Sequence, residues 1–497
     1  MLKSTGCFIL ALLVFIKPAK TQTFEKQIGE QQWHLMETLD GFVSGHGEET
    51  FALYEIPKEG FGILLLNTKG QVKWKTAIKE RPFIIARLEN KIVVLTGDKT
   101  GFSVGVNNIN AVLIDPETGK ILLQKTILSA NKSNLVVPTI YASETGKFLK
   151  IGLRYANESK GGKAAIMGRG VGKLHESGSQ ITKAEVLSFD KNMDLTNTQN
   201  LQFSTTNLLE GGSGMDPDGN ILYAGYNKDN NEVIIYRFPD GKAVPDKQMK
   251  VNVTVKKLEL IKDMQLLAGK KQSSIAYFIA NYKNEEKDYV YEIHRLDFNT
   301  GVKTMASDIL DKKYRKELEA RPVNSFKGVR KPDLDDIDDL KLTGIIEVEG
   351  KVIVCKDTEH SESSVSNTYM YAAGNGIISV YGNDMKKLYE NIIPKKYKSY
   401  LPFGLGIGLH VKDGNAYFVA NDSEAGYMKA RVLFGKIDIS SGNIISVEHL
   451  VKDDIAGAEP ADTQNIIWFK DKVIVNYMKL KGMISWAYTN MTCVYNY

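Results

Sequence analysis

Cysteine is scarce in this chain of 497 residues, which contains only Cys7, Cys355 and Cys493. Cys7 falls in an N-terminal segment that we expect to be removed, and the other two lie far apart in predicted strands. Domains that are built on disulfides carry many more cysteines than this. We therefore expect two buried thiols rather than a disulfide, in a fold stabilised by its hydrophobic core.

The chain also lacks an excess of charge of either sign. Its 64 basic and 59 acidic residues give a net charge of +5. Loss of residues 1–21 would remove Lys3, Lys17 and Lys20 and no acids, so that +5 becomes +2. So small a charge on so long a chain gives no electrostatic case for nucleic acid or anionic lipid as a partner.

Long apolar runs are missing as well. The run from Phe8 to Ile16 is too short to span a bilayer, and with Lys3 before it the segment is typical of a signal peptide. Cleavage after Thr21 would place Ala19 and Thr21 at the two small-residue positions. We expect residues 1–21 to be a signal peptide and the protein to be exported, whether periplasmic, secreted or on the cell surface, without a transmembrane segment.

What the sequence does contain is a repeated β-hairpin. The segment NAVLIDPETGKILLQKTI (110–127) joins two apolar runs by a turn rich in Asp, Thr and Gly, the residues that punctuate hairpins. The same pattern recurs at 62–78, 185–203, 233–251, 291–305, 376–393 and 432–450. A second hairpin family precedes the first, at 83–97, 139–155, 213–226, 343–355, 407–421 and 465–477.

Two successive hairpins make a four-stranded meander, which is the blade of a β-propeller. The predicted blades are 41–79, 82–128, 135–204, 208–253, 256–310, 340–394, 400–452 and 463–497. The last range holds only three strands, and QQWHLMETL (31–39) resembles QVKWKTAI (71–78), so an N-terminal strand would complete it. We predict an all-β chain whose residues 22–497 form one eight-bladed propeller, with seven blades as the alternative. A helical and acidic insertion is predicted at about 307–340.

The DPETGK turn resembles the repeat of quinoprotein-type (PQQ-like) propellers, in which an aspartate, then Thr-Gly-Lys, precede a tryptophan. Asp115, Thr118, Gly119 and Lys120 match this pattern, and Trp74 matches it in the preceding blade. The resemblance implies an eight-bladed ring. Quinoprotein dehydrogenases need adjacent cysteines, a calcium site and a catalytic aspartate, which are not found in this sequence. The resemblance therefore implies a non-catalytic member that binds other proteins, and no cofactor is expected.

Three segments resemble ligand-binding motifs without completing them. DKNMDLTNT (190–198) opens like a calcium loop, but Leu195 and Leu201 occupy the places of the glycine and the glutamate, which favours an ordinary turn. GRGVGKLHESGS (168–179) lacks the P-loop pattern and is interpreted as a surface loop. DLDDIDDL (333–340) would suit calcium, but a solvated loop is favoured. The seven histidines have no metal-ligand spacing, so neither metal nor catalytic residues are predicted.

The two faces of such a ring should differ. Tight turns join first to second and third to fourth strands on one face, and the long connections lie on the other, where binding residues are usually found. Second strands end there in a recurring set of polar residues, which we predict to bind a ligand: Tyr155, Tyr226, Tyr282, Asn421 and Tyr477. The alternative is that tyrosines only cap these strand ends beside water.

The sequence therefore favours a secreted or periplasmic binding or scaffold module that meets a protein or a glycan with its long-connection face. The alternative is a hydrolase or lyase acting on polysaccharide, with acidic residues gathered in the central channel.

Overall fold

The computed structural model describes most of the chain. The described residues are 23–34, 43–46, 49–56, 60–67, 71–80, 82–99, 106–129, 135–143, 145–156, 181–205, 208–227, 230, 232–253, 261–270, 272–319, 340–363, 369–399, 404–422, 430–450, 460–463, 466–481 and 487–497. The predicted signal peptide, the segment 168–179 and the aspartates of 333–339 lie outside them.

The described strands form eight antiparallel sheets, which we number along the chain. Sheet 1 holds β2 (Val43–His46), β3 (Glu49–Ile56), β4 (Gly60–Asn67) and β5 (Val72–Ile78). Sheet 2 holds β6 (Pro82–Leu88), β7 (Lys91–Lys99), β8 (Val106–Ile114) and β9 (Ile121–Ser129). Sheet 3 holds β10 (Leu135–Ala142), β11 (Leu149–Ala156), β12 (Ile181–Phe189) and β13 (Leu195–Leu201). Sheet 4 holds β14 (Leu208–Met215), β15 (Ile221–Asn227), β16 (Glu232–Phe238) and β17 (Lys247–Asn252).

The second half of the chain continues in the same way. Sheet 5 holds β18 (Ile261–Ala268), β19 (Ile275–Lys283), β20 (Tyr289–Asp297) and β21 (Lys303–Ile309). Sheet 6 holds β22 (Leu340–Val348), β23 (Lys351–Ser363), β24 (Tyr369–Gly382), β25 (Lys387–Ile393) and a fifth strand, β26 (Tyr397–Ser399). Sheet 7 holds β27 (Gly408–Lys412), β28 (Asn415–Asp422), β29 (Arg431–Asp438) and β30 (Ile444–His449). Sheet 8 holds β31 (Ile467–Trp468), β32 (Lys472–Lys481), β33 (Ala487–Asn496) and β1 (Thr23–His34).

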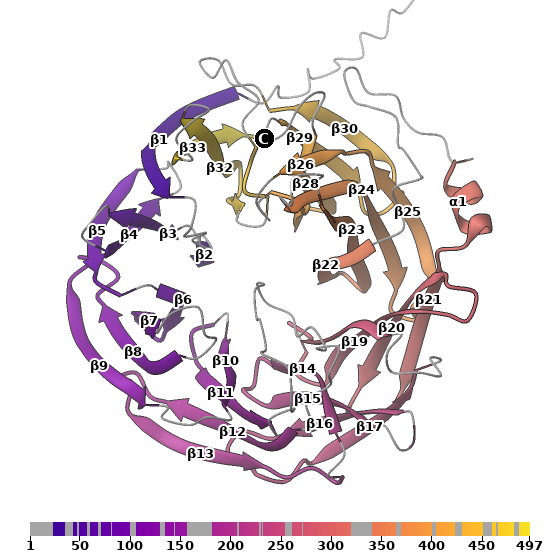
Figure 1. Cartoon of the computed structure of the whole chain (residues 1–497), viewed down its shortest axis with the longest axis horizontal. Coiled ribbons are helices and arrows are strands. Elements are labelled where there is room, and N and C mark those ends of the chain that lie inside the picture. Colours follow the sequence, from indigo (N-terminus) through magenta and orange to yellow (C-terminus); the bar gives the residue numbers. More distant parts are fainter. Residues whose placement is uncertain are drawn as a thin grey trace, which may run out of the picture.

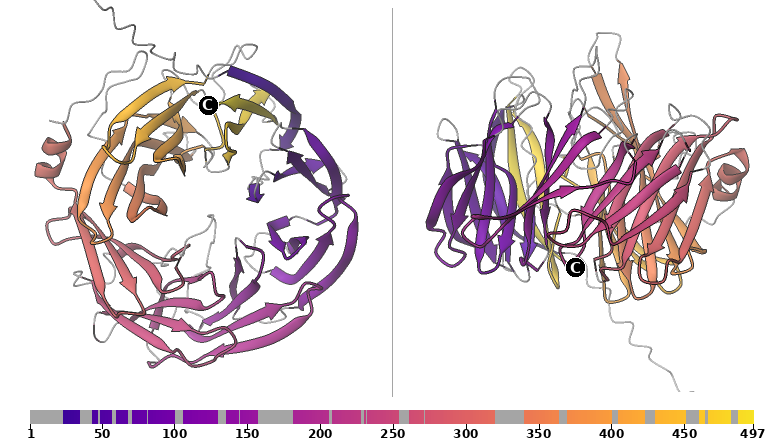
Figure 2. Two further views of the ribbon diagram at one scale, coloured as in Figure 1. Left: turned by 180° about the vertical axis from the view of Figure 1, so that it is seen from behind. Right: turned by 90° about the horizontal axis from the view of Figure 1, so that it is seen from below.

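The sheets stand side by side around a central axis and form a disc (Figures 1 and 2). Separate hydrophobic clusters fill every junction between successive sheets, including the one between sheet 8 and sheet 1. At that last junction Leu64 and Leu66 of β4 pack against Ile474 of β32 and Val494 of β33. The chain is therefore a β-propeller, and the predicted all-β fold is confirmed.

Burial along the strands follows their place in each sheet. The inner strands β15 and β19 are buried almost throughout, because neighbouring sheets cover both of their faces. The outermost strands β5, β17 and β21 alternate between exposed and buried residues, because their outward side chains meet water. This difference explains why the sequence shows apolar runs in one hairpin arm and alternation in the other.

An N-terminal strand closes the ring, as predicted. β1 pairs antiparallel with β33 from Thr23↔Asn496 to His34↔Ala487. The predicted bounds of 31–39 were wrong, because the closing strand must match the full length of β33 and so extends back to Thr23. Residues 35–39 lie outside the described part of the chain.

Two further boundaries differ from the prediction. The predicted seventh blade began at residue 400, whereas the strands of sheet 7 begin at Gly408, and residues 397–399 form β26 on sheet 6. Within the predicted insertion, residues 307–309 complete β21, and the helix α1 spans Lys312–Glu319. Asp311 caps this helix, since its carboxylate accepts the backbone N–H of Tyr314 at 2.7 Å.

Outer strands contact the tight turn of the following sheet. The indole of Trp74 in β5 packs over Gly119 of sheet 2 and donates to the carbonyl of Pro116 at 2.8 Å. Sheets 6 and 7 repeat the arrangement, with Tyr389 donating to the carbonyl of Ile439 at 2.7 Å beside Gly442. The glycine of the repeat motif thus provides room for an aromatic ring from the neighbouring sheet.

Deletion of residues 1–34 should open the ring and destabilise it. The loss of β1 leaves the edge of β33 without its partner strand, and such edges pair with other chains. Compared with a chain that lacks only residues 1–21, we expect a melting temperature lower by roughly 5–10 °C, together with oligomers in size-exclusion chromatography. An unchanged melting temperature and a monomeric profile would contradict closure by β1.

Substitution of Gly119 by alanine should cost more than the same change at Gly301. Both glycines have left-handed backbone (φ of 71° and 73°), but only at Gly119 would the new Cβ meet the indole, at 2.6 Å from Trp74 Cδ2. We expect Gly301→Ala to cost about 1 kcal/mol and Gly119→Ala about 2–4 kcal/mol of unfolding free energy, measured by urea denaturation. Equal costs would show that packing on Trp74 does not contribute.

Candidate functional site

The two faces of the disc differ in the length of their connections. On one face, the longest connection between elements is 239–246, between β16 and β17. On the other face, β11 and β12 are separated by residues 157–180, and β21 and β22 by residues 310–339, which include α1. We call these the tight-turn face and the long-connection face. The latter is the candidate functional site, because the scaffold of a propeller is rigid and its long connections carry specificity.

The aspartates of the tight-turn face accept hydrogen bonds from backbone N–H groups of their own turns. Asp115 accepts backbone N–H groups from Glu117 and Thr118 at 3.0 and 2.8 Å, and hydrogen bonding from Thr118 lowers the pKa of Asp115 below its usual value. Asp190 accepts N–H groups from Asn192 and Asp194, both at 2.8 Å. The segment that opens like a calcium loop is therefore a capped turn of the same kind, as predicted.

The five predicted ligand-binding residues lie in the second strands of their sheets, near the long-connection face. The structure buries four of them: Tyr226 is 2% exposed, Tyr282 3%, Asn421 1% and Tyr477 0%. In the folded chain these four side chains are therefore covered by the surrounding protein. Each of the four lies at or near the end of a second strand.

Two of these tyrosines bond within their own sheets. Tyr282 donates to Glu292 at 2.6 Å, and Glu292 also contacts His294 Nε2 at 3.2 Å, all within sheet 5. The hydroxyl groups of Tyr477 and Tyr495 lie 2.8 Å apart within sheet 8. For Tyr226, burial raises the pKa of the phenol.

Asn421, near the end of β28, connects its own strand to two segments that are distant in sequence. Its amide donates to the carbonyls of Gly404 at 2.7 Å and Ala461 at 2.8 Å, and its carbonyl accepts the N–H of Ala461 at 2.8 Å. The side chain therefore anchors the connections that enter sheets 7 and 8, which are distant in sequence.

Tyr155 is the one predicted residue whose side chain is partly exposed. Its hydroxyl donates to Glu185 at 2.8 Å, and the Lys183 ammonium lies 5.3 Å from its ring centre. Burial, together with Glu185, raises the pKa of Tyr155 to about 12, so the phenol is a neutral donor at physiological pH. Its ring and the two charged groups beside it form a mixed polar and aromatic surface.

The sequence did not predict a buried network of charges between sheets 5 and 6. Asp308 of β21 accepts from Lys356 of β23 at 2.5 Å and from Tyr381 of β24 at 2.7 Å, and pairs with Lys387 of β25 at 2.6 Å. Lys387 also pairs with Glu390 at 3.0 Å. The side chain of Lys356 is 0% exposed. Burial of Asp308 by itself would raise the pKa of its carboxyl group, but the ammonium groups of Lys356 and Lys387 hold this pKa well below its usual value.

A second buried ion pair connects sheet 6 to the entry of sheet 7. Lys395 and Asp357, both fully buried, lie 3.0 Å apart, and Asp357 also accepts the N–H of Ile407 at 2.8 Å. Lys395 donates to the carbonyl of Leu405 at 2.6 Å. Charged residues within strand patterns were the sequence signal for Asp308 and Lys356, which come from different sheets.

Sheet 6 extends beyond its neighbours on the long-connection face. β23 and β24 pair from Lys351↔Gly382 to Ser363↔Tyr369, whereas β22 pairs with β23 only as far as Leu340↔Thr358. Figure 2 shows this long hairpin, in orange, projecting from the disc. The hairpin is the most prominent described feature of that face.

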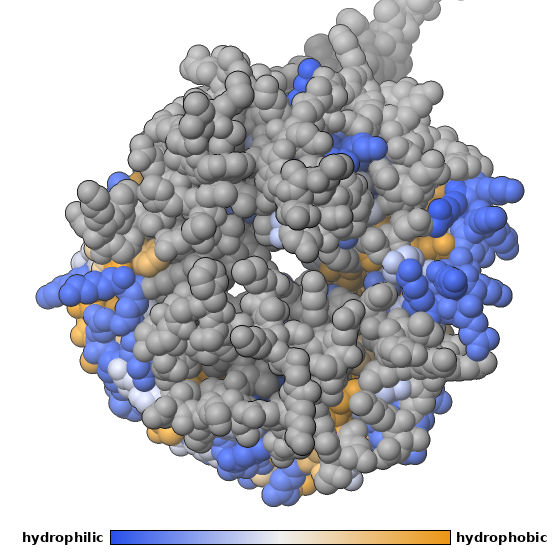
Figure 3. All heavy atoms as spheres, in the orientation of Figure 1, coloured by the Kyte–Doolittle hydropathy of each residue, from blue (hydrophilic) through white to orange (hydrophobic). Residues whose placement is uncertain are grey.

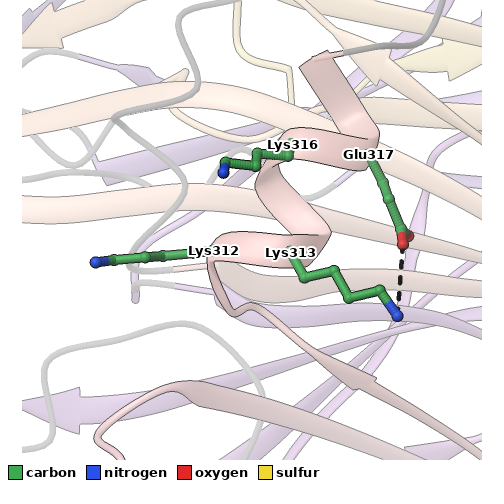
Figure 4. A pocket seen from close by; sticks show the side chains of 4 residues that line it. All are labelled: Lys312, Lys313, Lys316 and Glu317. Carbon is green, nitrogen blue, oxygen red and sulfur yellow. Dashed lines mark ion pairs between the residues drawn. The ribbon is translucent and has the colours of Figure 1, made fainter.

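The helix α1 lies at the outer rim of the disc and carries a hydrophilic surface (Figure 3). An open depression beside it is lined by Lys312, Lys313, Lys316 and Glu317. Figure 4 shows Lys313 paired with Glu317 at 3.9 Å, while Lys312 and Lys316 point away from this pair. Because these side chains are exposed, we interpret them as the solvated face of a helix whose Leu318 is buried against the ring.

Cys355 and Cys493 are buried thiols that form no disulfide, as predicted. Burial raises the pKa of the Cys355 thiol, which makes it unreactive. Within the described ranges, no group of three or more His, Cys, Asp or Glu side chains is arranged to hold a metal ion. In the same ranges, no helix has the length and apolar character that a membrane crossing requires.

Comparison with known proteins gives distant structural likenesses only. No family model and no curated protein matches the chain. Among solved structures, BamB from Moraxella catarrhalis is 11% identical over 95% of this chain and 99% of its own, with a TM-score of 0.43. The WD40 domain of SCAP from fission yeast is 11% identical over 94% of this chain and 98% of its own, with a TM-score of 0.40. A puromycin-hydrolysing peptidase from Mycobacterium tuberculosis is 11% identical over 88% of this chain and 58% of its own, with a TM-score of 0.38.

Replacement of Asp308 by asparagine should strongly destabilise the protein, because Lys356 would lose its buried ion-pair partner and Lys387 one of its two. We expect a loss of about 3–5 kcal/mol in urea denaturation at pH 7. The control Glu317→Gln breaks only the exposed pair with Lys313 and should cost less than about 0.5 kcal/mol.

The same comparison has a defined pH dependence. Since the folded pKa of Asp308 is lowered, its stabilisation is complete above the unfolded value of 3.8 and declines as the pH falls below it. The difference in unfolding free energy between the wild type and Asp308→Asn should therefore become smaller below pH 4. A difference that is the same at pH 3 and pH 7 would contradict an ionised Asp308.

Proposed function

We propose that this β-propeller is a secreted or periplasmic binding module whose long-connection face holds a protein or glycan ligand. The observation that carries the proposal is the unequal distribution of the connections: the tight-turn face has short, capped turns, and the opposite face has the long segments and the projecting β23–β24 hairpin. A rigid ring that varies on one face is the usual arrangement of a binding scaffold.

Acidic residues near the axis bear on the catalytic alternative. The first strands of the sheets lie nearest the axis (Figure 1), and their sequences contain three acids, Glu210, Asp263 and Glu347, in three different sheets. A glycoside hydrolase requires two carboxyl groups that face each other across one site. The polysaccharide-cleaving alternative would need two such carboxyl groups to meet across the axis, and we keep it as the second candidate.

Of the five residues predicted from the sequence, we propose that Tyr155 contacts the ligand. Its partly exposed ring beside Lys183 and Glu185 offers stacking and hydrogen bonding together. We propose that Tyr226, Tyr282, Asn421 and Tyr477 act indirectly, by fixing the strand ends from which the long connections leave.

The two faces can be tested by attaching a polymer to each. Both native cysteines of the exported chain are buried, so a single introduced cysteine can be labelled with a polyethylene glycol maleimide. Glu286 is an exposed residue of the long-connection face, and Glu117 is an exposed residue of the tight-turn face. We expect labelled Glu286→Cys to lose partner capture from the native envelope, or glycan-array binding, by at least about tenfold.

Labelled Glu117→Cys serves as the matched control and should keep capture within about twofold. The reverse result, with capture lost only when the tight-turn face is blocked, would overturn the proposed face. Turnover of a polysaccharide by the unlabelled protein, abolished by Glu347→Gln, would favour the enzymatic alternative.

A further inference from the structure

We propose that the outer edge of the tight-turn face attaches the protein to a lipid surface through a circle of exposed apolar side chains. This attachment goes beyond the proposed function, because it concerns the opposite side of the disc from the long-connection face.

The exposed apolar residues gather at one edge of the disc. Among the described residues, ten large apolar side chains are 37–59% exposed, and nine of these ten lie in the turn before the outermost strand of a sheet or within its first three residues. They come from seven successive sheets, and they are Val72, Ile121, Leu122, Leu195, Val244, Val302, Met305, Leu388 and Ile445.

These nine residues share one height on the disc. The third-to-fourth connections lie on the tight-turn face, so every outermost strand of sheets 1 to 7 begins there. Val244 and Val302 lie within two of these connections, 239–246 and 298–302. The circle is therefore at the edge of the side opposite to the projecting β23–β24 hairpin (Figure 2). Apolar residues scattered singly over a surface are ordinary, but a set that repeats at one edge of seven sheets is not scattered.

The direction of the side chains favours a lipid surface as the occupant. Exposed residues of the outermost strands point away from the ring, so a second rigid disc stacked on the flat face would leave them uncovered. A compact protein partner would reach the residues of a few sheets only. The interfacial region of a bilayer is fluid and takes up apolar side chains to a depth of about 5–10 Å, so it can surround the whole edge at once.

The start of the closing strand lies at the same face. Thr23 of β1 pairs with Asn496, which pairs in turn with Lys472, directly after the tight turn between β31 and β32. The chain that precedes Thr23 is therefore attached at the tight-turn face. That chain includes the apolar run 8–16 of the predicted signal peptide, which is expected to enter a membrane during export. Export would thus bring the face with the apolar circle to the bilayer.

The charge of the chain predicts the kind of lipid. The exported chain has a small net charge, so apolar contact rather than ionic attraction must supply the attachment. Exposed lysines such as Lys120 and Lys242 lie beside the apolar residues, and their long stems let the ammonium groups stay among the headgroups. We therefore expect attachment to neutral lipid, with little dependence on salt.

The test measures co-sedimentation of residues 22–497 with phosphatidylcholine vesicles. The predicted signal peptide is left out because its apolar run would bind lipid by itself. We expect a partition coefficient that changes by less than about twofold between roughly 0.05 and 0.5 M salt. The double variant Leu122→Ser with Leu195→Ser should lower this coefficient by at least about tenfold, because each substitution removes a half-exposed apolar side chain.

The two ends of β21 give a matched control. Val302 is 51% exposed just before the strand, and Ile309 is 45% exposed at its last residue, on the side away from the circle. Val302→Ser should lower the partition coefficient by about threefold, and Ile309→Ser should leave it within about 1.5-fold. Melting temperatures check that both variants fold, since exposed positions contribute little to stability. Equal losses of binding would contradict attachment by one edge.

A fluorophore gives a second readout that needs no loss of binding. Both native cysteines of the exported chain are buried, so an environment-sensitive dye can be attached to Val244→Cys or to Ile309→Cys. We expect vesicles to shift the emission of the first to shorter wavelength and to leave the second unchanged.

The outcomes are distinct. Absence of vesicle binding, or binding that the substitutions at the edge do not weaken, overturns the proposal. A dimer in analytical ultracentrifugation that the same substitutions dissociate assigns the circle to a second copy and also overturns it. The proposed function is decided separately: polymer-labelled Glu286→Cys should keep vesicle binding and lose capture, and labelled Glu117→Cys should do the reverse.

Discussion

A sheet of this protein has two hydrophobic faces, and both are buried only when a neighbouring sheet stands on each side. The hydrophobic clusters at every junction meet this requirement, and the cluster between sheets 8 and 1 brings the C-terminal strands against β4, while β1 completes sheet 8. Because apolar burial is the main favourable term in folding, the sheets are stable as a ring rather than one by one. The architecture of the rest of the molecule follows from this closure.

Polar contacts refine the packing at particular junctions. At the outer rim, Trp74 packs on the glycine of the next turn, which gives the repeat motif a physical meaning: its glycine provides space for an aromatic ring. Between sheets 5 and 6 the junction instead holds buried charges around Asp308. Such a network needs fixed geometry to offset the loss of hydration, so it favours one relative position of the two sheets. The projecting hairpin belongs to one of these two sheets.

A ring with this rigidity can carry variation on one face at little cost to its core. The tight turns must fit between the outer strands of adjacent sheets, whereas the long connections leave the disc and are free to differ in length. The buried side chains at the ends of the second strands, such as Asn421, hold the bases of these connections. Binding is therefore proposed where the scaffold imposes the fewest constraints.

The sequence by itself determined the hairpins, the capped turns and the free cysteines. Its alternating patterns and Asp-rich turns act over a few residues, as when Asp115 accepts the N–H of Thr118 three residues away. Only the tertiary structure decided which polar residues are accessible. Tyr226 and Tyr155 have similar positions in their strands, but the first is buried and the second is partly exposed. Likewise Lys356 meets Asp308 across 48 residues of chain. Burial and ion pairing depend on what the adjacent sheet presents, and no local pattern records that.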